Sequence, residues 1–278
     1  MGQRFLASRA VLQKIVGGAE LSKKDTVLEI GPGKGILTDE LAKKVKKVVA
    51  VEKDPRLVEF LKRKFEHMQN IEIIQGDILQ ISNYSAEGEI SPPGGGQLSI
   101  IKQVQNRYKI VANLPYYITS RFLRIFLSSE VEPPSMMVLM VQREVADRIC
   151  AKPPNMNLLA LSVQAFGEPK IIARVPRQAF RPPPSVDSAI IKITDISNAF
   201  FKKNKINPKE FFTFIRKAFS QKRKMLRASL HVQHRVLAKK RPQELSLENW
   251  IQLIRSRKYR FPMDNQIDPK PHSAIYRK

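Results

Sequence analysis

Residues 111–119, with the sequence VANLPYYIT, place groups that can orient an amine at the end of a hydrophobic run. The amide of Asn113 accepts a hydrogen bond with its oxygen, and the backbone carbonyl of Leu114 is a second acceptor. Pro115 stiffens the turn, and the ring of Tyr116 offers a face on which a base can stack. A purine amine is a poor nucleophile because its lone pair is delocalised into the ring. Two acceptors would aim that lone pair out of the plane, at an electrophile about 3 Å away, so the segment predicts activation of a purine amine by orientation.

A second set of residues upstream predicts a site for an adenosine. The turn EIGPGKG holds Gly31 and Gly33, and glycine there permits positive φ and close approach of a ligand to the backbone. Glu52 ends the next hydrophobic run and can accept hydrogen bonds from both hydroxyls of a ribose. Asp77 ends the third run and can accept one from an adenine amino group. The glycine spacing is G-x-G-x-G, not the G-x-G-x-x-G of dinucleotide sites, which argues against a nicotinamide oxidoreductase.

A mostly parallel sheet is the element that would bring these groups together. Five β-branched runs are predicted as strands, at residues 26–30, 47–52, 71–75, 108–113 and 136–142. Amphipathic helical patterns occur at residues 8–19, 36–45 and 55–65. Two later runs, 170–175 and 188–194, predict a hairpin added at one edge. Alternation of strands and helices is typical of βαβ units, whose strand ends open onto one crevice, so we expect an α/β Rossmann-like fold with the site at those ends.

Two breaks interrupt this alternation. Residues 82–107 include SPPGGGQ and have no period, which predicts a surface insertion. A second break near residue 200 separates an expected sheet domain, 1–200, from a helical basic domain, 201–278. In the latter, residues 216–230 predict one basic helix and residues 246–256 another.

Charge and composition narrow the class of partner. The chain has 49 Lys and Arg against 25 Asp and Glu, for a net charge of +24, and 18 of these basic residues lie after position 207. Such an excess indicates a polyanionic partner. The side chains that we expect to contact phosphates are those of Lys222, Arg223, Lys224 and Arg227. One cysteine, no Cys/His cluster with metal-site spacing and no long apolar run predict a cytoplasmic protein without a metal or a membrane partner.

Seven motifs in this order resemble the ribosomal RNA adenine dimethyltransferase family, KsgA type: GQRFL, LEIGPGKGILT, VEKD, GDIL, NLPYYI, FRPPPSVDSA and FSQKRKMLRASL. The resemblance covers about residues 2–255. It implies a seven-stranded methyltransferase sheet with a small all-helical C-terminal domain. It also implies S-adenosyl-L-methionine as methyl donor and dimethylation of two adjacent adenosines near the 3′ end of small-subunit ribosomal RNA. The expected partner is then a small ribosomal subunit precursor, with a monomer as the expected state of the enzyme.

The resemblance also assigns roles to individual residues. It implies cofactor contacts from residues of five motifs: Leu6, Gly31, Gly33, Glu52, Asp77 and Asn113. It makes residues 113–116 the catalytic turn and places Phe180 on the target base, opposite Tyr116. Arg4 stands where the family usually has Asn or His, and two effects are open for it: it could pair with the carboxylate of the cofactor's methionine moiety, or it could crowd the cofactor. Tyr117 and Thr119 are expected to be structural.

Two other functions remain open at this point. One is the related methyltransferase that modifies an adenine of large-subunit ribosomal RNA and confers antibiotic resistance, although NLPYY and the basic FSQKRKMLRASL segment favour the small-subunit type. The other is a non-catalytic RNA-binding ribosome assembly factor. Intact Glu52, Asp77 and NLPY favour an enzyme.

Overall fold

The computed structural model describes residues 5–80, 104, 107–127, 132–230, 232 and 234–256. They form two compact units: one contains the residues up to Ala151 and Leu159–Lys203, the other Lys152–Leu158 and the residues from Asn204 on. The predicted boundary at residue 200 lies close to this division. Residues 152–158 were expected in the first domain, but Met156 N donates to the Gln243 carbonyl at 2.9 Å, which ties that segment to the helical unit. Arg4 and nearly all of the 82–107 insertion lie outside the described residues.

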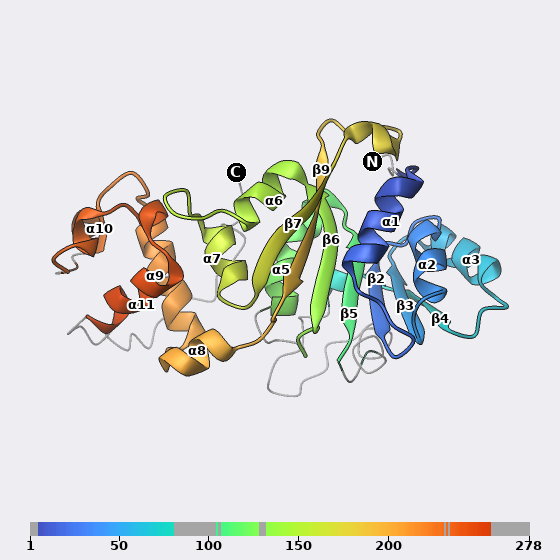
Figure 1. Ribbon diagram of the computed structural model, residues 1–278, viewed down its shortest axis with the longest axis horizontal. Coiled ribbons are helices and arrows are strands. Elements are labelled where there is room, and N and C mark those ends of the chain that lie inside the picture. The colour runs from blue at the N-terminus through green and yellow to red at the C-terminus, as the bar shows by residue number, and fades with distance from the viewer. Residues whose placement is uncertain are drawn as a thin grey trace. The chain divides into compact units, whose positions relative to one another are not determined.

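The described part of the first unit contains a seven-stranded sheet in the order β4-β3-β2-β5-β6-β9-β7 (Figure 1). The strands are β2 (Thr26–Ile30), β3 (Lys47–Glu52), β4 (Ile71–Gln75), β5 (Lys109–Asn113), β6 (Met136–Gln142), β7 (Glu168–Val175) and β9 (Ser188–Thr194). The first five are parallel, and β9 and β7 run antiparallel at one edge. The sheet and its edge hairpin are therefore as predicted. Because β9 is antiparallel to β6, its first residue lies at the carboxyl end of the parallel strands.

Amphipathic helices cover this sheet. They are α1 (Arg9–Gly18), α2 (Ile36–Ala42), α3 (Pro55–Lys64), α5 (Thr119–Leu127), α6 (Arg143–Ile149) and α7 (Leu158–Gln164), with α8 (Ala199–Asn204) at the exit. Short 3-10 turns occur at η1 (Ile78–Gln80), η2 (Tyr116–Ile118) and η3 (Arg177–Ala179). Helix α1 illustrates why they form: Ser8 caps its first turn, and Val11, Leu12, Ile15 and Val16 are buried on one face. No helix among the described residues is long and apolar enough to cross a bilayer.

A pair of very short strands joins the start of the chain to the segment before β9. In it, β1 (Phe5–Leu6) is antiparallel to β8 (Phe180–Arg181), with Leu6 opposite Phe180. Neither strand was predicted, since two residues are too few to show a period. The pairing brings the Phe5 ring beside the glycine turn that follows β2, where a Cβ on Gly33 would lie 3.2 Å from it.

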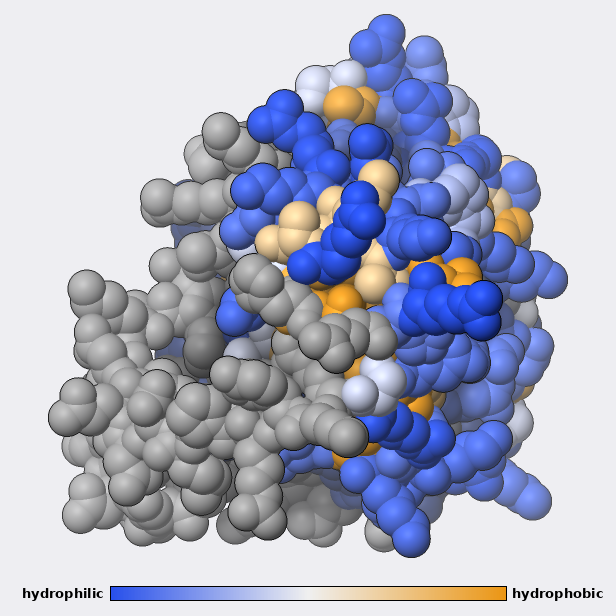
Figure 2. Space-filling view, turned by 90° about the vertical axis from the view of Figure 1, so that its left-hand side faces the viewer, coloured by the Kyte–Doolittle hydropathy of each residue, from blue (hydrophilic) through white to orange (hydrophobic). Residues whose placement is uncertain are grey.

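The second unit is helical, with α9 (Pro208–Phe219), α10 (Leu226–Leu230), α11 (Leu247–Arg255) and the turns η4 (Leu237–Lys239) and η5 (Pro242–Glu244). Trp250 is fully buried, with its ring centroid 5.9 Å from that of Phe214. The prediction of one basic helix over residues 216–230 is wrong, because α9 ends at Phe219 and a turn follows. Leu226 N donates to the Lys240 carbonyl at 2.9 Å, which redirects the chain into α10. Figure 2 shows the side of the molecule that is on the left in Figure 1, and hydrophilic residues cover most of the described surface visible there.

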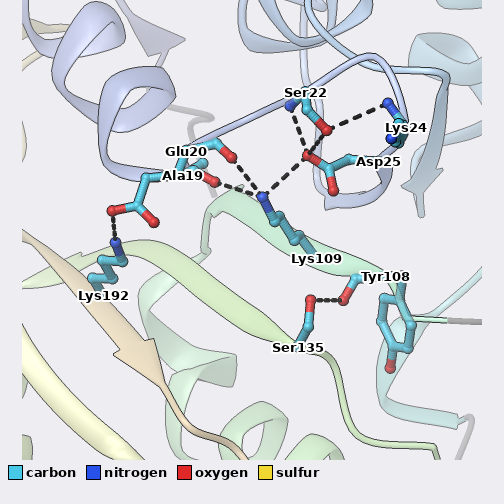
Figure 3. Close-up of polar contacts among 9 residues, drawn as sticks. All are labelled: Ala19, Glu20, Ser22, Lys24, Asp25, Tyr108, Lys109, Ser135 and Lys192. Carbon is cyan, nitrogen blue, oxygen red and sulfur yellow. Dashed lines mark hydrogen bonds and ion pairs between the residues drawn. The ribbon is translucent and has the colours of Figure 1, made fainter.

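Lys109 fastens the start of β5 to the loop between α1 and β2 (Figure 3). Its Nζ donates to the carbonyls of Ala19 and Glu20 at 3.2 and 2.6 Å, and it lies 3.1 Å from Asp25 Oδ2. The Lys109 and Asp25 side chains are both largely shielded from solvent. Burial favours the neutral acid, but the Ser22 N–H and Lys109 outweigh it and lower the pKa of Asp25. The network thus keeps Lys109 and Asp25 as a charged pair at the amino ends of β5 and β2.

We expect Lys109→Met to lower the free energy of unfolding by about 2 to 3 kcal/mol, because it leaves two carbonyls and a shielded carboxylate without their donor. Urea unfolding would measure the change. Lys47→Met is the matched control, since Lys47 pairs with Glu72 at 2.8 Å on a more exposed part of the same sheet and should cost under about 1 kcal/mol. Equal losses in the two variants would contradict the role of Lys109.

Candidate functional site

The glycine turn after β2 lies against the NLPY turn. Gly31 and Gly33 have φ of 64° and 59°, a region that glycine adopts without strain. The Gly31 N–H donates to the Val51 carbonyl at 2.9 Å. A Cβ on Gly31 would lie 3.8 Å from the Pro115 ring, so the two motifs are in direct contact although 84 residues separate them. The sheet has therefore brought the predicted adenosine site and the predicted amine-orienting turn together.

Glu52, the last residue of β3, lies beside the glycine turn. Glu52 is 7% exposed, and its Oε1 accepts from the N–H groups of Lys53 and Asp54 at 2.8 and 3.0 Å. Oε2 accepts from the Gly33 N–H at 3.3 Å. These bonds fix the carboxylate against the glycine turn. A carboxylate has about four acceptor positions, so it retains capacity for a hydroxyl of a ligand.

Asp77 follows β4 and is held by a neighbour that sequence reasoning missed. Its Oδ2 lies 2.9 Å from Lys53 Nζ, and its Oδ1 accepts from the Leu79 N–H at 3.0 Å. Burial would raise the pKa of Asp77, but Lys53 and the Leu79 N–H outweigh that effect and lower it. The side chain is therefore a charged acceptor at the end of β4, next to Glu52 at the end of β3. Lys53 follows Glu52 directly in VEKD, and only the fold shows that it reaches Asp77.

Asn113 ends β5 opposite Met140, and the next N–H, that of Leu114, donates to the Met140 carbonyl at 3.2 Å. This bond fixes the peptide that would present the second acceptor. The Asn113 side chain is half-buried and makes no hydrogen bond with any other described residue. Ile118 N donates to the Pro115 carbonyl at 3.1 Å, which closes the turn. The amide is thus positioned by its backbone and free to bind a ligand.

Tyr116 is anchored by a serine that sequence reasoning also missed. Its hydroxyl lies 2.8 Å from the hydroxyl of Ser188, the first residue of β9. Ser188 stands in the FRPPPSVDSA motif, which was the available signal, but its partner is 72 residues away. Of the two residues expected to be structural, Thr119 is buried and Tyr117 is 77% exposed. The turn therefore directs its two tyrosines differently.

Phe180 is not grouped with Tyr116 at an open face. It is 2% exposed and belongs to the core cluster that also contains Leu6, Val111 and Met140. The reason is the short strand pair: β1 covers the segment that carries Phe180. A base could reach this ring only if the two strands moved apart. Leu6, predicted to contact the cofactor, is also buried in that cluster, and Arg4 lies outside the described residues.

The four basic residues predicted to contact phosphates belong to the helical unit. Lys222, Arg223 and Lys224 lie in the turn between α9 and α10, and Arg227 lies in α10. All four are exposed, and among the described residues their side chains have no acidic partner. Exposed cations without partners are available for a polyanion.

Glu29, in β2, is a buried acid beside the site. Burial raises the pKa of Glu29 to about 8, and repulsion by Glu52 adds to the effect. Its Oε2 has no hydrogen-bond partner among the described residues, and the Thr38 hydroxyl has none either. Thr38 is nevertheless near enough to Glu29 to lower the pKa of its carboxyl, against the larger effect of burial. At neutral pH the carboxyl of Glu29 is therefore protonated in the folded chain and ionised in the unfolded one.

This difference predicts a pH dependence of stability. Because the folded-state pKa lies above the ordinary value of 4.5, the folded chain binds the extra proton between about pH 4.5 and 8, and stability falls as the pH rises. Relative to Glu29→Gln, we expect the wild type to lose about 1.4 kcal/mol of unfolding free energy per pH unit in that window. Urea unfolding of both proteins at pH 5, 6, 7 and 8 would test this. A difference that does not change with pH would contradict it.

Comparison with known proteins gives consistent results. The family described as ribosomal RNA adenine dimethylase matches residues 1–258. The chain is 43% identical over 226 residues to the ribosomal RNA small subunit methyltransferase A of Dehalococcoides mccartyi, covering 81% of this chain and 72% of that protein. It is 38% identical to the protein of that name from Rippkaea orientalis, over 90% of this chain and 93% of the other.

Two solved structures are similar as well. A dimethyladenosine transferase from Plasmodium falciparum aligns with a TM-score of 0.70 and 26% identity, covering 90% of this chain and 95% of the other. The 23S rRNA methyltransferase ErmE aligns with a TM-score of 0.65 and 25% identity, over 91% and 98%. A dimethyladenosine transferase and a 23S rRNA methyltransferase are therefore similar to this chain in fold, and the two relatives named small subunit methyltransferase A are the more similar in sequence.

Proposed function

The chain belongs to the ribosomal RNA adenine dimethylase family, and on that premise we propose which of its residues carry the reaction. It is an S-adenosyl-L-methionine-dependent methyltransferase that dimethylates adenine in small-subunit ribosomal RNA. This function is supported over a large-subunit methyltransferase and over a non-catalytic assembly factor. We propose as acceptors two adjacent adenosines near the 3′ end of that RNA. The observation that carries the assignment of residues is the contact of the glycine turn with the NLPY turn at Gly31 and Pro115.

The residues around the glycine turn fit the cofactor. The positive φ of Gly31 and Gly33 keeps the backbone open to a ligand, and Glu52, fixed by three N–H groups, has acceptor capacity left for ribose hydroxyls. Asp77, a charged acceptor, would take the adenine amino group. Arg4 and Leu6 complete the proposed set from the start of the chain. When bound, S-adenosyl-L-methionine supplies an electrophilic methyl group on its sulfonium.

The residues of the NLPY turn orient the target amine. The Asn113 side-chain oxygen and the Leu114 carbonyl accept its two N–H bonds and so direct its lone pair out of the ring plane. Tyr116 supports the base by its face, and Ser188 fixes that ring through the 2.8 Å contact with its hydroxyl. Phe180 would stack on the opposite face once the β1–β8 pair has moved aside. No general base is needed, since the alkylated amine is acidic enough to lose its proton to water.

The basic turn of the helical unit would hold the RNA. Lys222, Arg223, Lys224 and Arg227 would neutralise phosphates, which releases counterions and makes binding depend on salt. We also propose that the enzyme acts as a monomer in the cytoplasm, where a net charge of +24 opposes self-association.

Transfer of labelled methyl groups to small ribosomal subunits that lack the modification would test the function. The RNA is digested after the reaction and its nucleosides are identified. We expect dimethyladenosine at two adjacent positions. Large subunits are assayed in parallel: label in their RNA alone would support the resistance-type enzyme, and tight binding of small subunits without label would support the assembly factor.

A further inference from the structure

An open cavity lies beside the serine that holds the Tyr116 hydroxyl. It has a volume of about 590 Å³, within the range of ligand sites, and its lining residues are Arg143, Asp147, Arg174, Val175, Pro176, Asp187 and Ser188. Ser188 is the residue that anchors the Tyr116 hydroxyl at 2.8 Å. One residue therefore belongs both to the support of the stacking ring and to the wall of this cavity. A polynucleotide held on Tyr116 has its next nucleotide within reach of that wall.

The sheet fixes this placement. Asn113 of β5 is opposite Met140 of β6, and two residues further along β6, Gln142 is opposite Ser188 of β9. Arg143 then starts α6, so it follows directly on a strand that neighbours the catalytic turn. The Arg143 N–H donates to the Asp187 carbonyl at 3.0 Å, which closes this end of the cavity. The walls thus come from α6, from strands β7 and β9, and from the residues that directly flank these strands, Pro176 and Asp187.

The charges in the cavity are paired in a way that leaves donors available. Arg143 Nη1 lies 3.2 Å from Asp187 Oδ2, and Arg174 bonds both oxygens of Asp147, at 3.1 and 2.6 Å. A guanidinium has five N–H donors, so each arginine retains several. Both arginine side chains are more than half exposed, at 59% and 54%. The ion pairs hold the two guanidinium groups in place, which lowers the entropy lost when a phosphate binds.

The acids that pair with these arginines, Asp147 and Asp187, can accept hydrogen bonds from the base of a nucleotide. The Arg174 guanidinium lowers the pKa of Asp147, so this carboxylate is ionised and can only accept hydrogen bonds. A base with an exocyclic amine, such as adenine, offers the matching donor. Cations for a phosphate and carboxylates for an amine therefore line the same cavity.

We propose that this cavity binds the RNA nucleotide next to the adenosine being methylated, with Arg143 and Arg174 contacting its phosphates. This rests on the proposed function, and it adds a subsite that selects for a neighbouring nucleotide. It accounts for an acceptor made of two adjacent adenosines, since one can occupy the cavity while the other lies on Tyr116.

Single variants Arg143→Ala and Arg174→Ala, and the double variant, would test the subsite. Arg63→Ala is the matched control, because Arg63 also pairs with an acid, Glu59, and is 77% exposed on α3. We expect each cavity variant to raise the KM and the Kd for small subunits about tenfold, and the double variant more. The slope of log Kd against log salt should fall by about one for each arginine. The Kd for S-adenosyl-L-methionine should stay within about twofold of wild type, which also reports that the sheet unit is folded.

The outcomes separate this inference from the function on which it rests. If the wild type transfers no methyl group, the proposed function fails, and the Kd for small subunits still compares the cavity variants with Arg63→Ala. If the wild type is active but the cavity variants match Arg63→Ala in KM, Kd and salt slope, the subsite is refuted. Weakened binding of both small subunits and S-adenosyl-L-methionine would also refute it, since the arginines would then act on the fold.

Discussion

Asn113→Ala is expected to lower kcat for methyl transfer by about 10²- to 10³-fold, the loss that follows removal of one preorganised polar group from an active site. The Kd for small subunits should change by less than about threefold, because RNA affinity comes mainly from phosphate contacts elsewhere. Single-turnover transfer of labelled methyl groups would measure the chemical step. The large effect follows from the chemistry: without the Asn113 oxygen, the Leu114 carbonyl alone accepts from the amine, and one acceptor does not fix the direction of a delocalised lone pair.

A second substitution at the same position separates acceptor from donor. Asn113→Asp keeps an acceptor oxygen where the amine is expected and removes only the NH₂ group, so we expect it to retain more activity than alanine. The fold should tolerate both changes, because no other described residue bonds the Asn113 side chain and its backbone pairs with Met140 regardless. If Asn113→Ala keeps more than half of the wild-type kcat, the turn does not activate the amine.

The sheet and the placement of the site at its strand ends could be predicted because both depend on local patterns. The runs that end at Glu52 and Asn113 are β-branched and separated by amphipathic helices, and parallel strands end on the same side. Residues that follow such strands must therefore meet, and the contact of Gly31 with Pro115 is the result. Residues at strand ends, such as Glu52 and Asn113, could therefore be placed at one edge of the sheet from their positions in the sequence alone.

What could not be predicted depends on pairings between distant residues. The bond from Tyr116 to Ser188 and the ion pair of Lys53 with Asp77 leave no periodic trace in the sequence. The family resemblance implied that Phe180 stacks on the target base, but it could not show that two residues of β1 are enough to bury this ring. The basic segment, residues 216–230, was predicted as one helix because its charges and apolar residues keep a helical period. The end of α9 at Phe219 and the bond from the Leu226 N–H to the Lys240 carbonyl show that the chain turns before α10 begins.

Glu52→Gln is expected to weaken binding of S-adenosyl-L-methionine by about 10²-fold or more. The proposed role gives the carboxylate two hydroxyl donors from the ribose, and hydrogen bonds to a charged group contribute about 1.5 to 3 kcal/mol each. Glutamine has the same shape and keeps one acceptor oxygen, so the Lys53 and Asp54 N–H groups can still be satisfied at the end of β3. Only the Gly33 N–H, 3.3 Å from Oε2, loses its acceptor, so the loss should be large in cofactor affinity and small in stability. Isothermal titration calorimetry would give the Kd, and urea unfolding the stability.

Glu72→Gln is the matched control for this experiment. Glu72 is on β4, in the same sheet, and pairs with Lys47 at 2.8 Å, but it is about one third exposed and lies near the amino end of its strand, away from the carboxyl ends that form the site. Its substitution should leave the Kd for the cofactor within about twofold. If Glu52→Gln binds as tightly as Glu72→Gln, the buried carboxylate serves only to hold the glycine turn through Gly33, and the ribose must be bound by other groups. If instead only Glu52→Gln loses affinity while both remain folded, the acid at the end of β3 is the group that recognises the cofactor.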